Sequence, residues 1–206
     1  MEIAMSLLAF IDTETTGLNP QDNEIIEIAI KIIDTEQVNW NDRVDWCSDE
    51  YGEFVRYDMQ GATMPTIYKF VGKFKMRFAD KAEPKALEVN GYNEKDWENA
   101  YEWNKQACER MIKRLKDCVI VGHNVQFDLD FIQQECKRQG VKCPRFSVLD
   151  TKGMARFMWD SKTLKSVSMD SIRKANPEHF SMEGAHRAMK DVDDCITLWN
   201  LFYHNR

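Results

Sequence analysis

The sequence of 206 residues predicts an α/β fold built on a mixed sheet. Two apolar, β-branched runs at residues 3–11 and 24–34 are separated only by a Gly- and Pro-containing turn, which is typical of neighbouring antiparallel strands. Farther along, short apolar strands at 119–122 and 146–149 alternate with segments of helical periodicity. An antiparallel start followed by alternating strands and helices favours one mixed sheet.

The composition indicates a single-domain cytoplasmic protein. The hydrophobic fraction of 43% is ample for a core, and we expect residues 1–206 to form one domain. No apolar stretch approaches the roughly 18 residues that a membrane helix requires, and the apolar N-terminus lacks the basic leader of a signal peptide. Without such a leader we expect the scattered cysteines to be free thiols rather than zinc ligands: Cys47, Cys108, Cys118, Cys136, Cys143 and Cys195.

The formal net charge of −6 argues against a nonspecific nucleic-acid coat, but it does not exclude an enzyme that meets phosphates through metal ions. Local charge is more informative. At residues 67–78, apolar side chains alternate with Lys69, Lys73, Lys75 and Arg77, which predicts a strand with one basic face. This face suits a nucleic-acid channel, and it suits equally a solvated edge strand that uses lysines against aggregation.

Two carboxylates interrupt the first strand where a buried strand would simply continue. Asp12 and Glu14 project from the same face, roughly 7 Å apart along the strand. A divalent cation between them removes both their repulsion and their loss of hydration, which favours a Mg²⁺ or Mn²⁺ site. A strand that ends in a solvated Asp-Thr-Glu-Thr turn is the alternative, so the interpretation depends on partners elsewhere in the chain.

Periodicity and capping residues predict the helices. Apolar residues that recur from Trp97 to Leu115 indicate a long amphipathic helix, in which we expect Trp97 and Tyr101 to be core residues rather than a base-stacking platform. Other helices are expected at 85–92 with a stop at Asn90-Gly91, from about 125 to 139, from Asp150-Thr151 onward, at 169–174 and at 188–203, whereas 35–66 has no clear periodicity.

Two further carboxylates lie where helix geometry requires apolar side chains. At about 100° per residue, Asp191 falls within the apolar stripe of the last helix, whereas Asp193 points to the opposite side and Asp194 lies on the flank. The same projection places Asp128 on an apolar face, while Asp130 points away. A charge rarely occupies such a stripe unless it is paired or binds a metal. Capping of a helix start is an alternative for Asp128 and explains Asp191 poorly.

Four carboxylates that converge at one end of a sheet suffice for two metal ions. Such sites suit phosphodiester cleavage, because the ions stabilise the attacking and leaving oxygens of an in-line displacement. The cleavage also needs a general base. His186 follows Gly184 in the expected loop before the last helix, where its imidazole is free to lie over the metals and take a proton from water. A surface loop histidine is the alternative.

Three segments carry a resemblance in their order and spacing: Phe10-Ile-Asp-Thr-Glu-Thr-Thr-Gly-Leu18, Val121-Gly-His-Asn-Val-Gln-Phe-Asp128 and His186-Arg-Ala-Met-Lys-Asp191. Together they resemble the DEDDh family of 3′–5′ exonucleases in the ribonuclease H-like superfamily, which includes the proofreading epsilon subunit of bacterial DNA polymerase III. Leu149-Asp150-Thr151 and Ala86-Leu-Glu-Val-Asn-Gly-Tyr92 also look like this family. The resemblance covers nearly the whole chain and implies a five-stranded mixed sheet with helices on both faces.

The resemblance also implies a role for each candidate residue. Two Mg²⁺ or Mn²⁺ ions would be held by Asp12, which bridges them, and by Glu14, Asp128 and Asp191, with His186 as the general base. Thr15 and Leu18 would hold the terminal nucleotide, whereas His123 and Asn124 would orient the site or contact the substrate strand. Many relatives have His-Gly-Ile where this chain has Asn90-Gly91-Tyr92, so the contact of Asn90 with the terminal nucleotide is expected to differ.

We therefore expect a metal-dependent 3′–5′ exonuclease that releases nucleoside 5′-monophosphates and prefers single-stranded DNA over RNA. An RNA 3′ exonuclease of the RNase T or oligoribonuclease kind is one alternative, because nothing in the sequence clearly recognises a 2′-hydroxyl. A catalytically inactive binding module is another, although it has no need of all five catalytic side chains. Because the chain ends soon after the last helix, we expect a stand-alone or phage-type enzyme, with a DNA polymerase as a further candidate partner.

Overall fold

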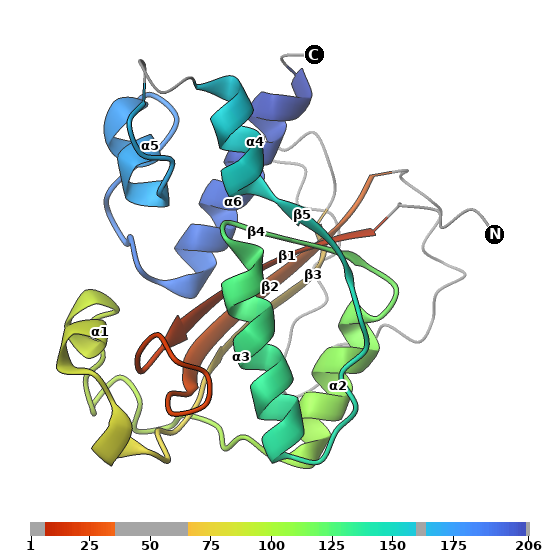
Figure 1. Ribbon diagram of the computed structural model, residues 1–206, viewed down its shortest axis with the longest axis vertical. Coiled ribbons are helices and arrows are strands. Elements are labelled where there is room, and N and C mark those ends of the chain that lie inside the picture. The colour runs from red at the N-terminus through yellow and green to blue at the C-terminus, as the bar shows by residue number, and fades with distance from the viewer. Residues whose placement is uncertain (1–6, 36–65, 160–163, 205–206) are drawn as a thin grey trace.

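The computed structural model describes residues 7–35, 66–159 and 164–204 (Figure 1). Within them, five strands form one sheet in the order β3-β2-β1-β4-β5. The pairings β1–β2 and β2–β3 are antiparallel, whereas β1–β4 and β4–β5 are parallel, so the predicted mixed sheet is confirmed. The strands are β1 (Leu7–Thr15), β2 (Ile25–Asp34), β3 (Thr66–Lys73), β4 (Val119–Gly122) and β5 (Ser147–Asp150).

Helices cover both faces of this sheet, as expected. The helices α2 and α3 pack on one face and α6 on the other, with α4 and α5 packed against α6 (Figure 1). None of the described helices is both long and apolar enough to cross a membrane. After the 3-10 helix η2 (Ala79–Lys81) come α1 (Pro84–Val89), α2 (Lys105–Leu115), α3 (Val125–Arg138), α4 (Thr151–Met158), α5 (Met169–Ala175) and α6 (Ala188–His204).

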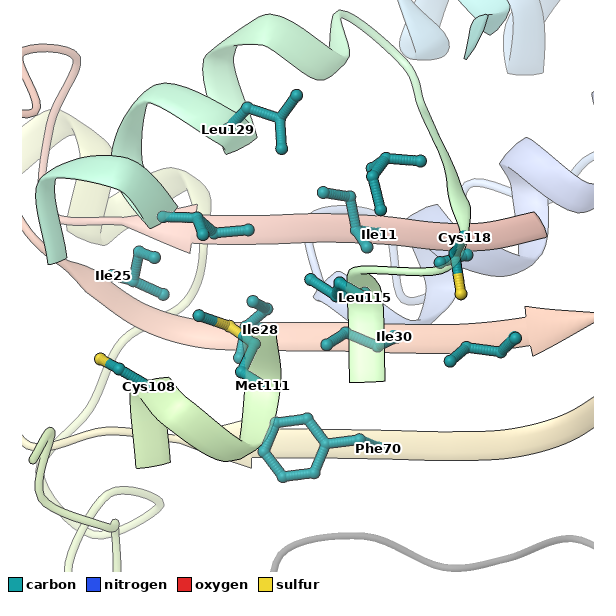
Figure 2. Close-up of a cluster of buried hydrophobic side chains, with 14 of the residues drawn as sticks. Ile11, Ile25, Ile28, Ile30, Phe70, Cys108, Met111, Leu115, Cys118 and Leu129 are labelled. Carbon is teal, nitrogen blue, oxygen red and sulfur yellow. The ribbon is translucent and has the colours of Figure 1, made fainter. Parts of the chain in front are cut away.

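Alternation along β1 decides which face of the sheet receives each side chain. Ile11 belongs to the buried cluster beneath α2 and α3, whereas Phe10 belongs to the cluster against α6. Figure 2 shows the first cluster, in which apolar side chains from the sheet meet those of α2 and α3. Continued alternation places Asp12 and Glu14 on the face of Phe10, toward α6. The core pattern of β1 therefore positions both carboxylates.

The basic strand predicted at 67–78 is correct only in part. The strand β3 ends at Lys73 and lies at the edge of the described sheet, as the solvated-edge interpretation requires. Beyond it the chain turns away, because the carboxylate of Glu24 accepts bonds from the backbone amides of Arg77 and Phe78 and from the Arg77 side chain. Since Arg77 is turned toward this acid, the prediction of one continuous basic stripe is wrong.

The long helix predicted to begin at Trp97 is also shorter than expected. The helix α2 begins at Lys105, after Asn104, whose side chain caps it. Trp97 lies in the preceding turn and is buried as predicted, with Nε1 donating to the carbonyl of Ile26 at 2.9 Å. Tyr101 is 40% exposed, so its prediction as a core residue is wrong. The aromatic spacing of a turn that folds onto the sheet imitated helical periodicity here.

The described cysteines are free thiols, as predicted: Cys108, Cys118, Cys136, Cys143 and Cys195. Cys47 lies outside the described residues. So do residues 3–6 of the first predicted strand and most of the segment from 35 to 66, for which no helix or strand is predicted.

Candidate active site

Four carboxylates from three elements meet at the C-terminal end of β1. Asp12 and Glu14 extend from β1, Asp128 from the first turn of α3 and Asp191 from the first turn of α6. Glu14, Asp191 and His186 offer ligand atoms that all lie within 4.8 Å of one another. Burial is the largest cause of the raised pKa of Asp12, and the charges of the nearby Asp128, Asp191 and Glu14 raise this pKa further. The structure therefore brings together the carboxylates that the sequence singled out.

Burial and mutual repulsion disfavour the charged forms of these groups. Burial, followed by the charge of Asp191, raises the pKa of Glu14 to about 8. Burial raises the pKa of Asp128 to about 7, and it raises the pKa of Asp12 and Asp191 as well. A hard divalent cation accepts carboxylate oxygen and supplies the missing positive charge, so this set of donors fits Mg²⁺ or Mn²⁺.

The strand β1 itself holds Asp128 in place. Its Oδ1 accepts bonds from the backbone amide of Thr13 at 2.9 Å and from the Thr13 hydroxyl at 2.7 Å. Asp128 is 4% exposed, whereas Asp130 is exposed, as the helix projection predicted. Because Thr13 lies between Asp12 and Glu14, these two bonds fix the carboxylate from α3 beside both carboxylates of β1.

His186 lies in the loop before α6, as predicted. Its backbone is left-handed with φ 61°, shortly after Gly184 with φ 72°, and α6 begins two residues later at Ala188. A non-glycine residue adopts this conformation uncommonly, and such strain concentrates at functional sites. The imidazole Nε2 lies 3.4 Å from Oδ2 of Asp170. The ring therefore has Asp170 as a neighbour and also lies close to Glu14 and Asp191.

Arg173 is a further member of the site that the sequence did not indicate. Its side chain on α5 is fully buried and bonds Asp170, Asp191 and Asp194. A helix of seven residues is too short for a reliable face projection, and a fully buried arginine is rare. The sequence does contain one signal for this residue: Arg173 follows Asp170 by three positions, a spacing that brings opposite charges together on one side of a helix.

The flank of α6 also differs from the prediction. Asp194 is 4% exposed and is bound by Arg173 and Lys190, because the packing of α5 against α6 turns this flank into interior. Asp193 pairs with Lys31 of β2 and keeps a side chain that is 46% exposed. The helix projection is therefore correct for Asp191, and the flank on which it places Asp194 is buried by α5.

A cavity of about 250 Å³ opens at the site. Asp12, Asp191 and His186 line it together with Ser168 and Asp170 at the start of α5. These carboxylates therefore face space that small groups can enter, instead of closing entirely onto the core.

The match to known proteins agrees with this geometry. Residues 9–199 match the model of the exonuclease family RNase_T. The chain belongs to this exonuclease family. The 3′–5′ exonuclease DinG of Staphylococcus epidermidis is 24% identical over 196 residues, which are 95% of this chain and 18% of that protein. DinG of Staphylococcus aureus is 25% identical over 201 residues, or 98% of this chain and 18% of that protein. The chain thus spans about a fifth of the length of these relatives.

Solved structures of E. coli Exonuclease I share the fold of this exonuclease-family chain. The zinc-bound complex with single-stranded DNA has a TM-score of 0.71 at 19% identity, over 98% of this chain and 41% of that one. The complex with a dT13 oligonucleotide has a TM-score of 0.68 at 18% identity, over 95% and 40% of the two chains. The expected ribonuclease H-like architecture is therefore confirmed, whereas the likeness to the epsilon subunit stays a prediction.

Three of the residues expected to bind substrate lie at or beside the turn after β1: Thr15 ends the strand, Leu18 lies in the turn, and Asn90 at the end of α1 binds back to it. Thr15 is buried, and its hydroxyl donates to the carbonyl of Gly17 at 2.7 Å. Asn90 is 3% exposed; its amide donates to the carbonyl of Thr15 at 3.0 Å, and its oxygen accepts the Tyr92 amide at 3.2 Å. Leu18 is 75% exposed. Thr15 and Asn90 therefore shape the turn, and Leu18 is its exposed apolar side chain.

His123 and Asn124 lie at the junction of β4 and α3. His123 is tied into the fold, since its Nδ1 lies 3.1 Å from the Thr151 hydroxyl and its Nε2 lies 2.7 Å from the carbonyl of Val167. Burial lowers the pKa of this imidazole. Asn124 is exposed, has a left-handed backbone with φ 74°, and accepts a bond from Lys152 at 3.3 Å. Of the two, Asn124 is the one open to solvent.

Proposed function

We propose that this chain is a metal-dependent 3′–5′ exonuclease that releases nucleoside 5′-monophosphates from single strands. The observation that carries the proposal is the cluster of Asp12, Glu14, Asp128 and Asp191 at the end of β1, with His186 beside it. Membership of the exonuclease family and the similarity to relatives named 3′–5′ exonucleases support this reading.

The proposed cofactor is a pair of Mg²⁺ or Mn²⁺ ions, which these four carboxylates would hold. When bound, such ions supply the charge that stabilises the attacking and leaving oxygens of the displacement. Thr13 keeps one oxygen of Asp128 occupied and so leaves the other, Oδ2, as the atom for an ion. The two bonds thereby restrict the orientation of the Asp128 carboxylate, which orientation-dependent catalysis requires.

His186 is the proposed general base. Its Nε2 faces the carboxylate of Asp170 at 3.4 Å, which leaves Nδ1 to take the proton of the attacking water. Imidazole is suited to this role because one ring nitrogen can accept a proton while the other donates a hydrogen bond. Asp170 is then the group that orients the ring.

For the substrate, we propose the 3′ end of single-stranded DNA. The support is that the similar Exonuclease I chains were solved with single-stranded DNA, including a dT13 oligonucleotide. The exposed Leu18 is placed to lie against an unpaired terminal base, because an apolar side chain stacks on any base without reading its edge. A preference for DNA over RNA and an association with a DNA polymerase remain predictions.

Digestion of labelled strands tests the proposal. A single strand labelled at its 3′ end and one labelled at its 5′ end, each as DNA and as RNA, are incubated with Mg²⁺ and with EDTA. We expect immediate release of mononucleotide from the 3′ label, faster from DNA, and no release in EDTA. Faster release from RNA would select the RNA exonuclease alternative. If Mg²⁺-loaded protein left every strand intact, the chain would be a binding module instead.

A further inference from the structure

One guanidinium lies behind the carboxylate cluster. The side chain of Arg173 has 0% exposure and donates Nε to Asp194 Oδ2 at 2.7 Å, Nη1 to Asp170 Oδ1 at 3.0 Å and Nη2 to Asp191. A buried guanidinium is costly unless its donors find acceptors. Here each of its three nitrogens donates to a different carboxylate, so the buried positive charge is compensated on all sides.

Two of these three carboxylates belong to the site. Asp191 is a proposed metal ligand, and Asp170 lies 3.4 Å from the imidazole of His186 through its second oxygen. Arg173 therefore contacts the ligand on one edge and, through Asp170, the proposed base on another. The third contact, with Asp194, anchors the guanidinium to α6, where Lys190 also binds that carboxylate.

The position of this charge has opposite consequences in the two states of the site. Without metal, Asp12, Glu14 and Asp191 repel one another, and a nearby buried cation offsets part of that repulsion. With divalent ions bound to Asp191, the guanidinium and the ions share one carboxylate, and cations so close together repel. The same residue is thus favourable to the metal-free site and unfavourable to the loaded one.

We propose that Arg173 is an internal counter-cation of the site, which holds Asp191 directly and His186 through Asp170 while metal is absent, and which weakens metal binding by its charge. The inference rests on the proposed metal site. Arg173 and the metal ions compete for the Asp191 carboxylate, and such coupling is reciprocal. Removal of Arg173 therefore has two linked effects: it destabilises the metal-free protein more than the loaded protein, and it tightens metal binding.

An ordinary buried ion pair would behave differently, and the chain contains a matched example. Arg77 donates Nε to Glu24 at 2.9 Å and both Nη atoms to Glu135, at 2.9 and 2.6 Å. Neither of these acids is among the four carboxylates of the site. Arg77→Met is therefore a control that removes an arginine bound by several bonds to carboxylates without changing the proposed metal ligands.

The experiment compares the full chain, Arg173→Met and Arg77→Met by thermal unfolding in EDTA and with Mn²⁺, and by calorimetric titration of Mn²⁺. For Arg173→Met we expect a fall in Tm that is larger in EDTA than in Mn²⁺ by about 3–6 °C, which is a 10-fold change in affinity expressed as Tm in a chain of this size. We also expect its dissociation constant for Mn²⁺ to fall roughly 10-fold, within the usual range of coupling between sites. Arg77→Met should lose the same Tm in both buffers.

Equal losses for Arg173→Met in the two buffers, or weaker Mn²⁺ binding, would overturn the proposal and make Arg173 a structural residue only. If the unchanged protein neither bound Mn²⁺ nor gained Tm from it, the metal site itself would be wrong. If Arg173→Met does not fold in EDTA, Arg173→Gln decides, because glutamine removes the charge but keeps hydrogen-bond donors for the carboxylates. Its loss of Tm should again be larger in EDTA, and equal losses would again reject the proposal.

Discussion

Thr13 donates two hydrogen bonds to Oδ1 of Asp128, from its backbone amide at 2.9 Å and from its hydroxyl at 2.7 Å. The hydroxyl belongs to a residue of β1 whose neighbours, Asp12 and Glu14, point to the opposite face. One strand thus supplies two candidate ligands directly and fixes a third that comes from α3. This relationship explains how three carboxylates from two elements keep a common geometry although they repel.

Thr13→Val tests whether this second bond matters to the site. The substitution keeps the shape and the backbone bond but removes the hydroxyl, so the Asp128 carboxylate loses one of its two Thr13 donors. We expect kcat to fall by about 10- to 100-fold, as for other groups that orient a metal ligand, and Mn²⁺ affinity to fall with it.

Thr13→Ser is the matched control, because it restores the hydroxyl without the methyl group. Steady-state kinetics and Mn²⁺ titration should place this variant close to the unchanged protein. If Thr13→Val and Thr13→Ser were impaired equally, the presence of the hydroxyl would not decide activity and the positioning role would be wrong.

The neighbouring acids of α6 separate the proposed ligand from an ordinary surface charge. Asp191→Asn should reduce cleavage by more than about 100-fold, since changes outside the ligand set alone cost up to that much. Asp193→Asn should reduce it by less than about 2-fold, because the pair with Lys31 involves a half-exposed carboxylate. Initial rates on a 3′-labelled strand at saturating Mg²⁺ measure both. The reverse order would show that the helix projection selected the wrong acid.

Much of the site was predictable from the sequence because it depends on regular geometry. The alternation of β1 places Asp12 and Glu14 on one face, and the helical period identifies Asp128 and Asp191 as carboxylates in apolar stripes. Both rules act on neighbouring residues. The mixed order of the sheet followed for the same reason, from the hairpin-like start and the later alternation of strands and helices.

The features that were missed depend on contacts between distant segments. Arg173 is buried only because α5 packs against α6, and the same packing buries Asp194, which the projection had placed on the flank. Likewise, β3 ends early because Glu24, more than fifty residues away, binds the amides that follow it. A charge that is satisfied by a remote partner leaves no periodic signal in its own segment.

Leu18 provides a test of substrate contact that leaves the fold unchanged. Its side chain is 75% exposed, so Leu18→Ser should shift Tm by less than about 2 °C. If Leu18 lies against the terminal base, the KM for a single strand should rise several-fold, the equivalent of part of one stacking contact of about 1–3 kcal/mol. Val148→Thr, at an exposed position on β5, is the control. An unchanged KM for Leu18→Ser would exclude the contact.

The metal-free protein should become less stable as pH rises across the titration of its buried carboxyl groups. The pKa of Glu14 is raised from 4.5 to about 8 and that of Asp128 from 3.8 to about 7, mainly by burial. A carboxyl group whose pKa is raised on folding contributes stability below its unfolded pKa, and this contribution is lost as pH rises through the folded pKa. In EDTA, Tm should therefore fall between about pH 4.5 and about pH 8.

Glu14→Gln isolates the contribution of one of these groups. In EDTA its Tm should match that of the unchanged protein at about pH 3, where the carboxyl is neutral in both the folded and the unfolded chain, and should exceed it by a few degrees near pH 9. With Mn²⁺ near pH 9 the order should reverse, because the unchanged protein then gains a ligand that glutamine supplies poorly. Glu88→Gln, an exposed position on α1, should follow the unchanged protein throughout. If Glu14→Gln gave the same Tm as the unchanged protein in EDTA at both pH values, the raised pKa of Glu14 would be wrong, and a failure to reverse with Mn²⁺ would remove Glu14 from the proposed ligands.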